Sequence, residues 1–210
     1  NCRHCYINLP SEDAEAGVAE LSSEEIVRIA DQATEMGSLW CLVTGGEPLL
    51  RPDFEDIYLL LKKKGFLVSV FTNATLVNED HVKLFKHYPP RDLEVTVYGM
   101  TKATYERVTR KHGSFESFQR GLKLLVDNGV PLRMKTMALK SNLHEIHQIA
   151  EFCRRHTKDY FRFDPFLHLR YDGEEKRNAE IIEERLSPDE IVAVEDRKST
   201  RLNSSHGYIS

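Results

Sequence analysis

The chain has 210 residues, of which 40% are hydrophobic and 30% charged, a composition typical of a globular protein with one substantial core. Its formal net charge of −4 does not indicate a nucleic-acid partner, and no apolar run is long enough to cross a membrane. Four cysteines in a chain of this length do not suggest the disulfide framework of a small secreted domain. We therefore expect a cytoplasmic protein without nucleic-acid or membrane partners.

The N-terminal part predicts a loop, a helix and a strand. Residues 7–20 are polar and contain a proline, so they predict a loop. Ser22 and Glu25 form a capping box ahead of apolar residues at helical spacing, and the helix is expected to end at Gly37. The apolar run 40–43 predicts a strand that is buried on both faces.

Helices and strands then alternate along the chain. We predict helices over 53–64, 78–87, 101–110, 114–127 and 143–156, and strands over 67–71, 93–97, 132–138 and 160–163. Asn78 and Ser114 are expected to be N-caps. Repeated strand–helix–strand units predict an α/β fold, with a five-stranded parallel sheet and helices packed outside it.

The pattern changes after residue 168. Residues 170–177 are charged and rich in turn formers, and Ser187 with Pro188 begins a short helix. Residues 196–206 match the translation of a common sequencing adapter, so we expect residues 196–210 not to be native and exclude them from the fold. We thus divide the chain into a core over 1–168, a linker over 169–195 that leads to a further C-terminal extension, and this tail.

Three side chains within these elements are assigned structural roles. Cys41 and Cys153 have apolar neighbours and are predicted to be buried small hydrophobic residues. Lys135, near the end of the strand over 132–138, is expected to be a solvated or structural lysine.

Two motifs carry the chemistry. Cys2 and Cys5 form a C-x-x-C pair, which by itself is compatible with half of a zinc site, a thiol redox pair or part of an iron–sulfur site. Residues 45–48, Gly-Gly-Glu-Pro, follow the first predicted strand. Their glycines let the backbone approach a ligand closely, and Glu47 offers a carboxylate for a charge-assisted hydrogen bond.

Together these motifs resemble those of the radical S-adenosylmethionine (radical SAM) superfamily. Enzymes of that family bind a [4Fe-4S] cluster through C-x-x-x-C-x-x-C and carry G-G-E-P after their second strand. Cys2 and Cys5 match the second and third cysteines, and the first would lie four positions before Cys2, ahead of Asn1. The resemblance covers residues 1–168 and implies a partial (β/α)6 barrel that lacks its first strand here. We therefore expect a fragment that does not hold a stable cluster by itself.

The resemblance also implies a role for individual residues. The two cofactors would be the [4Fe-4S] cluster and S-adenosylmethionine (SAM). Cys2 and Cys5 would bind the cluster. The residues expected at the SAM site are His4 near the adenine, Gly45 and Gly46 along the backbone, Glu47 at the ammonium group, Thr72 and Asn73 nearby, and Thr96 at the ribose. Thr72 and Asn73 could instead form only a turn, and Thr96 could be a strand residue without a contact to SAM.

The expected function is reductive cleavage of SAM, which starts radical chemistry on an unknown substrate with an electron from an external one-electron donor. Residues 163–166 and 186–188 resemble the branch with a C-terminal SPASM-type auxiliary cluster domain, which implies a peptide or protein substrate. The alternative is a non-enzymatic metal-binding or thiol redox module that uses Cys2 and Cys5. That alternative leaves residues 45–48 unexplained.

Overall fold

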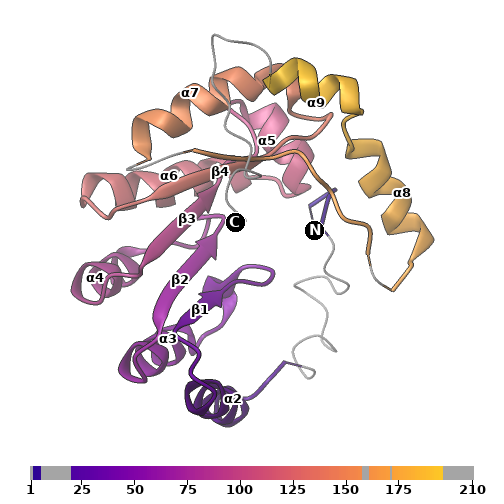
Figure 1. Ribbon diagram of the computed structural model, residues 1–210. Helices are drawn as coiled ribbons and strands as arrows, with labels where there is room; N and C mark the ends of the chain where they lie inside the picture. Colours follow the sequence, from indigo (N-terminus) through magenta and orange to yellow (C-terminus); the bar gives the residue numbers. More distant parts are fainter. Residues whose placement is uncertain (1, 6–19, 158–160, 171, 196–210) are drawn as a thin grey trace.

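The computed structural model describes residues 2–5, 20–157, 161–170 and 172–195. Five parallel strands form one sheet in chain order: β1 (Trp40–Val43), β2 (Leu67–Thr72), β3 (Asp92–Thr96), β4 (Arg133–Met137) and β5 (Arg162–Asp164). The sheet is curved and its helices lie on the convex side, so that the fold is an open partial barrel (Figure 1). The expected α/β architecture with a parallel sheet is confirmed.

The helices follow the predicted pattern closely. They are α2 (Ser23–Glu35), α3 (Phe54–Lys63), α4 (Glu79–His87), α5 (Lys102–Thr109), α6 (Ser114–Asp127), α7 (Ile146–His156), α8 (Glu175–Glu184) and α9 (Pro188–Glu195). Short 3-10 turns cover Pro48–Leu50 and Leu143–Glu145. Ser22 and Asn78 cap their helices as predicted, whereas Gly113, at φ +75°, takes the N-cap position expected for Ser114. No helix in the described part of the chain has the length and apolarity that a membrane span requires.

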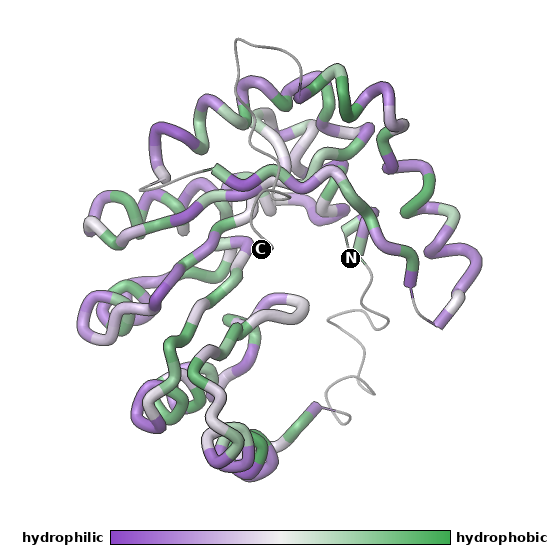
Figure 2. Tube along the Cα trace, in the orientation of Figure 1, coloured by the Kyte–Doolittle hydropathy of each residue, from purple (hydrophilic) through white to green (hydrophobic). Residues whose placement is uncertain are grey.

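The hydrophobic core lies between the sheet and its helices. Side chains alternate between the two faces of a strand, and Val70, Val95 and Phe163 are buried on the face that the helices cover. Along the helices apolar and polar residues alternate with each turn, as Figure 2 shows. The other set of strand positions, which includes Glu94 and Thr96, therefore faces the concave interior of the partial barrel.

Strand β1 differs from the prediction. Its residues were expected to be buried on both faces, but Trp40 is 58% exposed and Leu42 is 47% exposed. Cys41 is only half-buried, so its predicted burial is wrong, whereas that of Cys153 is confirmed. The physical reason is that β1 is an edge strand of the described sheet, paired with β2 alone.

The segment after β5 also differs from the prediction. Residues 170–177 were expected to form a charged turn, but helix α8 begins at Glu175. This helix packs on the core, because Ile181 is fully buried and the backbone N–H of Lys140 donates to the Glu184 carbonyl oxygen (3.0 Å). The proposed adapter-derived tail, 196–210, lies outside the described residues.

Candidate functional site

The two N-terminal cysteines form one side of the site. The backbone N–H of Cys5 donates to the Cys2 carbonyl oxygen (3.1 Å), which folds the C-x-x-C segment into a turn. Both thiols are free and partly buried. Burial raises the pKa of the Cys2 thiol. His4, between the two cysteines, contacts the ring of Tyr98, so the turn lies beside the loop that follows β3.

Helix α8 holds this cysteine turn in place. Arg177 donates through Nη2 to the carbonyl oxygens of Cys2 (3.0 Å) and Cys5 (3.4 Å). Arg3, between the cysteines, pairs with the buried carboxylate of Glu184 (2.9 Å). Figure 1 shows the N-terminal segment beside α8. Sequence reasoning missed Arg177, because nothing in the local pattern indicates that a residue so distant along the chain reaches the turn.

His4 supplies an aromatic surface next to the cysteines. Its ring centroid lies 5.4 Å from that of Tyr98. Burial, with a contribution from Arg177, lowers the pKa of His4 to about 4, so the imidazole is neutral near pH 7. Its Nδ1 atom is buried and has no hydrogen-bond partner in the described structure. His4 therefore keeps a free polar atom at the place where the resemblance expects the adenine.

The second side of the site is built around Glu47. This carboxylate is 8% exposed and joins the loop after β1 to the end of β2. Its Oε1 accepts from the Thr72 hydroxyl (2.7 Å) and from the Leu49 N–H (3.2 Å), and its Oε2 accepts from the Asn73 N–H (2.7 Å). Burial raises the pKa of Glu47, and these hydrogen bonds oppose the rise. The structure thus brings together three of the residues predicted from the sequence.

The contacts assign different tasks to these residues. The Thr72 hydroxyl also accepts from the Ala74 N–H (3.0 Å), and the Asn73 side chain accepts from the Thr75 N–H (2.9 Å) in a local turn. Both residues are thus engaged within the chain, and they orient Glu47. A carboxylate has about four acceptor positions, and three are used, so Oε2 of Glu47 keeps one position for a ligand.

The glycines beside Glu47 leave room for a ligand. Gly45 has φ +140°, a conformation that side chains disfavour. A Cβ atom added at Gly45 or Gly46 would meet no atom within 4 Å. The backbone ahead of Glu47 is therefore open to a bound molecule.

Thr96 lies apart from this cluster, on the concave face of β3. It is 6% exposed and pairs in register with Lys135 of β4. On the same face, Oε1 of Glu94 lies 2.8 Å from Lys135 Nζ and 3.1 Å from an Arg162 nitrogen. Lys135 therefore has the structural role expected for it. Within the described structure no hydrogen bond joins Thr96 to Glu47, and the contact of Thr96 with the ribose remains a prediction.

The described residues fit part of an iron–sulfur site. Thiolates are the ligands that iron–sulfur clusters use, and Cys2 and Cys5 provide two. Within the described ranges no group of three or more His, Cys, Asp or Glu side chains is placed to hold a metal ion, so a third ligand would have to come from elsewhere. Tyr105, whose ring lies 5.7 Å from that of Tyr98, has a buried hydroxyl without a hydrogen-bond partner in the described structure. Sequence reasoning missed Tyr105, although Tyr98 was recognisable as the residue after a strand end.

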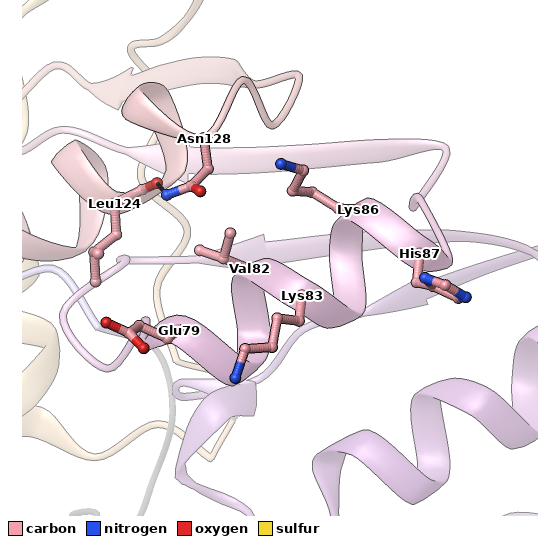
Figure 3. Close-up of a pocket in the computed structure, with 7 residues that line it drawn as sticks. All are labelled: Glu79, Val82, Lys83, Lys86, His87, Leu124 and Asn128. Atoms are coloured by element: carbon pink, nitrogen blue, oxygen red, sulfur yellow. Dashed lines mark hydrogen bonds between the residues drawn. The ribbon is translucent and has the colours of Figure 1, made fainter.

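A surface pocket in the described part of the chain lies away from these residues. It is formed between α4 and α6 on the helical layer, with Glu79, Lys83 and Lys86 on one side and Leu124 and Asn128 on the other (Figure 3). The Asn128 side chain donates to the Leu124 carbonyl oxygen (2.8 Å) across its wall. None of the residues predicted from the sequence lines this pocket.

Sequence comparison identifies relatives with known activities. The chain is 27% identical to the antilisterial bacteriocin subtilosin biosynthesis protein AlbA of Bacillus subtilis (strain 168), over 84% of this chain and 41% of AlbA. It is also 27% identical to the Fe-coproporphyrin III synthase of Methanosarcina barkeri (strain Fusaro / DSM 804), over 98% of this chain and 49% of the synthase. The chain therefore spans less than half the length of these relatives.

Solved structures show the same fold. Streptococcus suis SuiB bound to the precursor peptide SuiA superposes with a TM-score of 0.67 at 16% identity, over 97% of this chain and 45% of SuiB. Native anSMEcpe with bound AdoMet and the Cp18Cys peptide superposes with a TM-score of 0.65 at 15% identity, over 97% of this chain and 59% of that chain. The family model of the radical SAM superfamily matches residues 1–153. This chain belongs to the radical SAM superfamily.

Proposed function

We propose that this chain forms the core of a radical SAM enzyme. Cys2 and Cys5 would bind a [4Fe-4S] cluster, with a third ligand from outside the described residues. The cluster, when bound, supplies the electron that cleaves SAM and so starts radical chemistry. The observation that carries the proposal is the geometry of the carboxyl edge of the sheet, where His4 of the cysteine turn contacts Tyr98 and where Thr72 and Asn73 orient Glu47.

Each residue has a defined task in this proposal. Oε2 of Glu47 accepts from the ammonium group of SAM, a charge-assisted hydrogen bond in a buried setting. Gly45 and Gly46 leave the backbone open for the bound molecule. The neutral ring of His4 packs against the adenine, and Thr96 donates or accepts at the ribose. Thr72 and Asn73 keep the carboxylate of Glu47 in one orientation.

The experiment is anaerobic reconstitution of the full-length protein with iron and sulfide. We expect an electron paramagnetic resonance signal of a reduced [4Fe-4S] cluster and formation of 5′-deoxyadenosine from SAM. Both should be lost in Cys2→Ala and Cys5→Ala. Cys41→Ala is the matched control, since Cys41 is a free cysteine outside the turn. Zinc or a Cys2–Cys5 disulfide in place of the cluster would instead support the metal-binding or thiol redox module.

The structure gives that alternative no specific support. Reactive redox thiols have lowered pKa values, whereas burial raises the pKa of Cys2. A metal-binding or redox module also needs no carboxylate oriented at the end of β2, yet three donors fix Glu47 there.

For the substrate we propose a peptide or protein. The support is the likeness to a bacteriocin biosynthesis protein together with the resemblance to the branch with a SPASM-type domain. Because the chain is also similar to an Fe-coproporphyrin III synthase, a test compares a peptide with a porphyrin as the substrate. The reconstituted protein would be incubated with SAM and reductant and with either pooled peptides or iron coproporphyrin III. A mass change in a peptide supports the proposal, and turnover of the porphyrin alone contradicts it.

A further inference from the structure

Helix α8 lies beside the cysteine turn, although the two are distant in the sequence (Figure 1). The helix also follows the part of the chain that the radical SAM family model matches, residues 1–153. Arg177, Ile181 and Glu184 recur at i, i+4 and i+7, which places them on one face of an α-helix. Ile181 is fully buried in the middle of this face. The face that α8 packs on the fold therefore has a charged residue at each end.

Arg177 binds the backbone of both cysteines. Its Nη2 atom donates to the carbonyl oxygens of Cys2 (3.0 Å) and Cys5 (3.4 Å). The backbone N–H of Cys5 donates to the same Cys2 carbonyl oxygen (3.1 Å), so the guanidinium bridges the two ends of the turn. Because the donors of a guanidinium have a fixed, planar arrangement, this one side chain fixes the two cysteine backbones relative to each other.

The guanidinium of Arg177 is itself held in place. Its Nη1 atom forms an ion pair with Glu180, one turn further along α8. The Glu180 carboxylate also accepts from Nη1 of Arg110 (3.0 Å), the residue at the C-terminal end of α5. Hydrogen bonds from a charged donor are stronger than those between neutral groups. The orientation of Arg177 toward the cysteine turn is therefore set before any group binds there.

Arg3 joins the middle of the turn to the same two helices. Its backbone N–H donates to the Val108 carbonyl oxygen of α5 (3.0 Å), and its side chain forms ion pairs with Glu183 (3.3 Å) and Glu184 (2.9 Å) of α8. Glu184 is 3% exposed, and its carboxylate also accepts from the N–H (3.0 Å) and the hydroxyl (2.6 Å) of Ser141, in the loop after β4. Helices α5 and α8 therefore both hold the turn, through contacts within the chain.

We infer that Arg177 is a positioning residue that preorganises the cysteine turn for the cluster. The inference rests on the proposed function, in which Cys2 and Cys5 bind that cluster. Ligands that are already held in the arrangement they need lose less conformational freedom on binding, and so they bind more tightly. Arg177 contacts the cysteines through their carbonyl oxygens, and both thiols are free. It therefore acts on the cluster through the backbone of the turn.

The first measurement is hydrogen exchange in the full-length protein before reconstitution, followed by mass spectrometry of a peptide that contains residues 2–5. The amides of Arg3 and Cys5 donate within the chain and should exchange slowly. Arg177→Met keeps the length of the side chain but removes its donors, so these amides should exchange about tenfold faster or more. Lys176→Met is the matched control, because Lys176 is exposed on the same helix, and its exchange should equal that of the unaltered protein.

The second measurement is retention of the cluster after anaerobic reconstitution. An iron chelator is added to the full-length protein, and the loss of iron and of the electron paramagnetic resonance signal of the reduced cluster is followed with time. We expect Arg177→Met to lose the cluster about tenfold faster or more than the unaltered protein. Lys176→Met should lose it at the rate of the unaltered protein.

The outcomes separate this inference from the proposed function. Equal exchange at residues 2–5 in Arg177→Met and the unaltered protein would overturn the inference, and so would faster exchange without faster loss of the cluster. Faster exchange that extends equally over α8 would show that Arg177 only stabilises the helix, and it would also overturn the inference. An unaltered protein that holds no cluster, although its turn exchanges slowly, would overturn the proposed function and with it the role of Arg177 toward the cluster.

Discussion

Replacing Glu47 separates its role in the fold from its role toward SAM. Glu47→Ala removes the acceptor for the N–H groups of Leu49 and Asn73 and for the Thr72 hydroxyl. Each buried donor left without a partner costs about 1–3 kcal/mol. Because these effects are not additive and water can enter beside Gly46, we expect a total loss of about 2–4 kcal/mol in the free energy of unfolding. Chemical denaturation of the full-length protein measures it.

Glu47→Gln should lower the free energy of unfolding less than Glu47→Ala does, but it should weaken the binding of SAM as much. Its amide oxygen can still accept from Asn73, and a neutral side chain avoids the burial of a charge. However, it carries no negative charge and so cannot form a hydrogen-bonded ion pair with an ammonium group, an interaction worth about 1.5–3 kcal/mol. We therefore expect SAM to bind about tenfold to 150-fold more weakly in both variants, as measured by calorimetry on the full-length protein.

The pH dependence provides a check on the same residue. Burial raises the pKa of Glu47, against the hydrogen bonds from Asn73, Thr72 and Leu49, so the folded protein binds this proton more readily than the unfolded chain. Stability relative to Glu47→Gln should therefore fall as the pH rises from the unfolded pKa, about 4.3, through the raised folded pKa.

The reasoning would be refuted if Glu47→Ala unfolded at the same denaturant concentration as the unaltered protein, or if Glu47→Gln bound SAM equally well. Glu55→Gln serves as the control, because Glu55 is exposed on α3. Its effect on stability should stay within about 0.5 kcal/mol.

Three further predictions concern residues outside the Glu47 cluster. Burial alone would raise the pKa of Glu145, but hydrogen bonds to its carboxylate outweigh this effect and lower the pKa. The stability that Glu145 contributes above its unfolded pKa should therefore be lost as the pH falls through the folded pKa. Glu145→Gln should flatten the acid limb of a series of denaturation measurements against pH, and an unchanged limb would contradict this prediction. Gly121→Ala places a Cβ atom 1.9 Å from the Ala74 carbonyl oxygen, in the turn after β2, and should cost about 1–3 kcal/mol or more in thermal unfolding; an unchanged midpoint would show that the turn yields freely. In the native protein a thiol reagent should modify the half-buried Cys41 well before Cys153, because Cys153 is buried and its burial raises the pKa of its thiol. Mass spectrometry measures the order of modification, and the reverse order would contradict the burial of Cys153.

Local sequence signals were sufficient for most elements of the fold, although helix α8 was missed. Ser22 with Glu25, and Asn78, mark helix starts because capping depends on groups within one turn. The strands were found because buried apolar runs and turn formers lie next to each other in the chain. The same rule failed at β1, since an apolar run does not reveal how many neighbours a strand has, and β1 has only β2 in the described sheet.

The sequence by itself determined which residue types meet at the strand ends. Cys2, Cys5 and Glu47 were predicted because residues 2–5 and 45–48 resemble the motifs of the radical SAM superfamily, and the carboxyl ends of parallel strands share one edge. Only the tertiary structure decided that Thr72 and Asn73 orient Glu47, that Arg177 of α8 reaches the cysteine turn, and that the Tyr105 hydroxyl is buried without a partner in the described structure. These contacts join residues that are far apart in the chain, and their formation depends on how helices and loops pack, which no local pattern encodes.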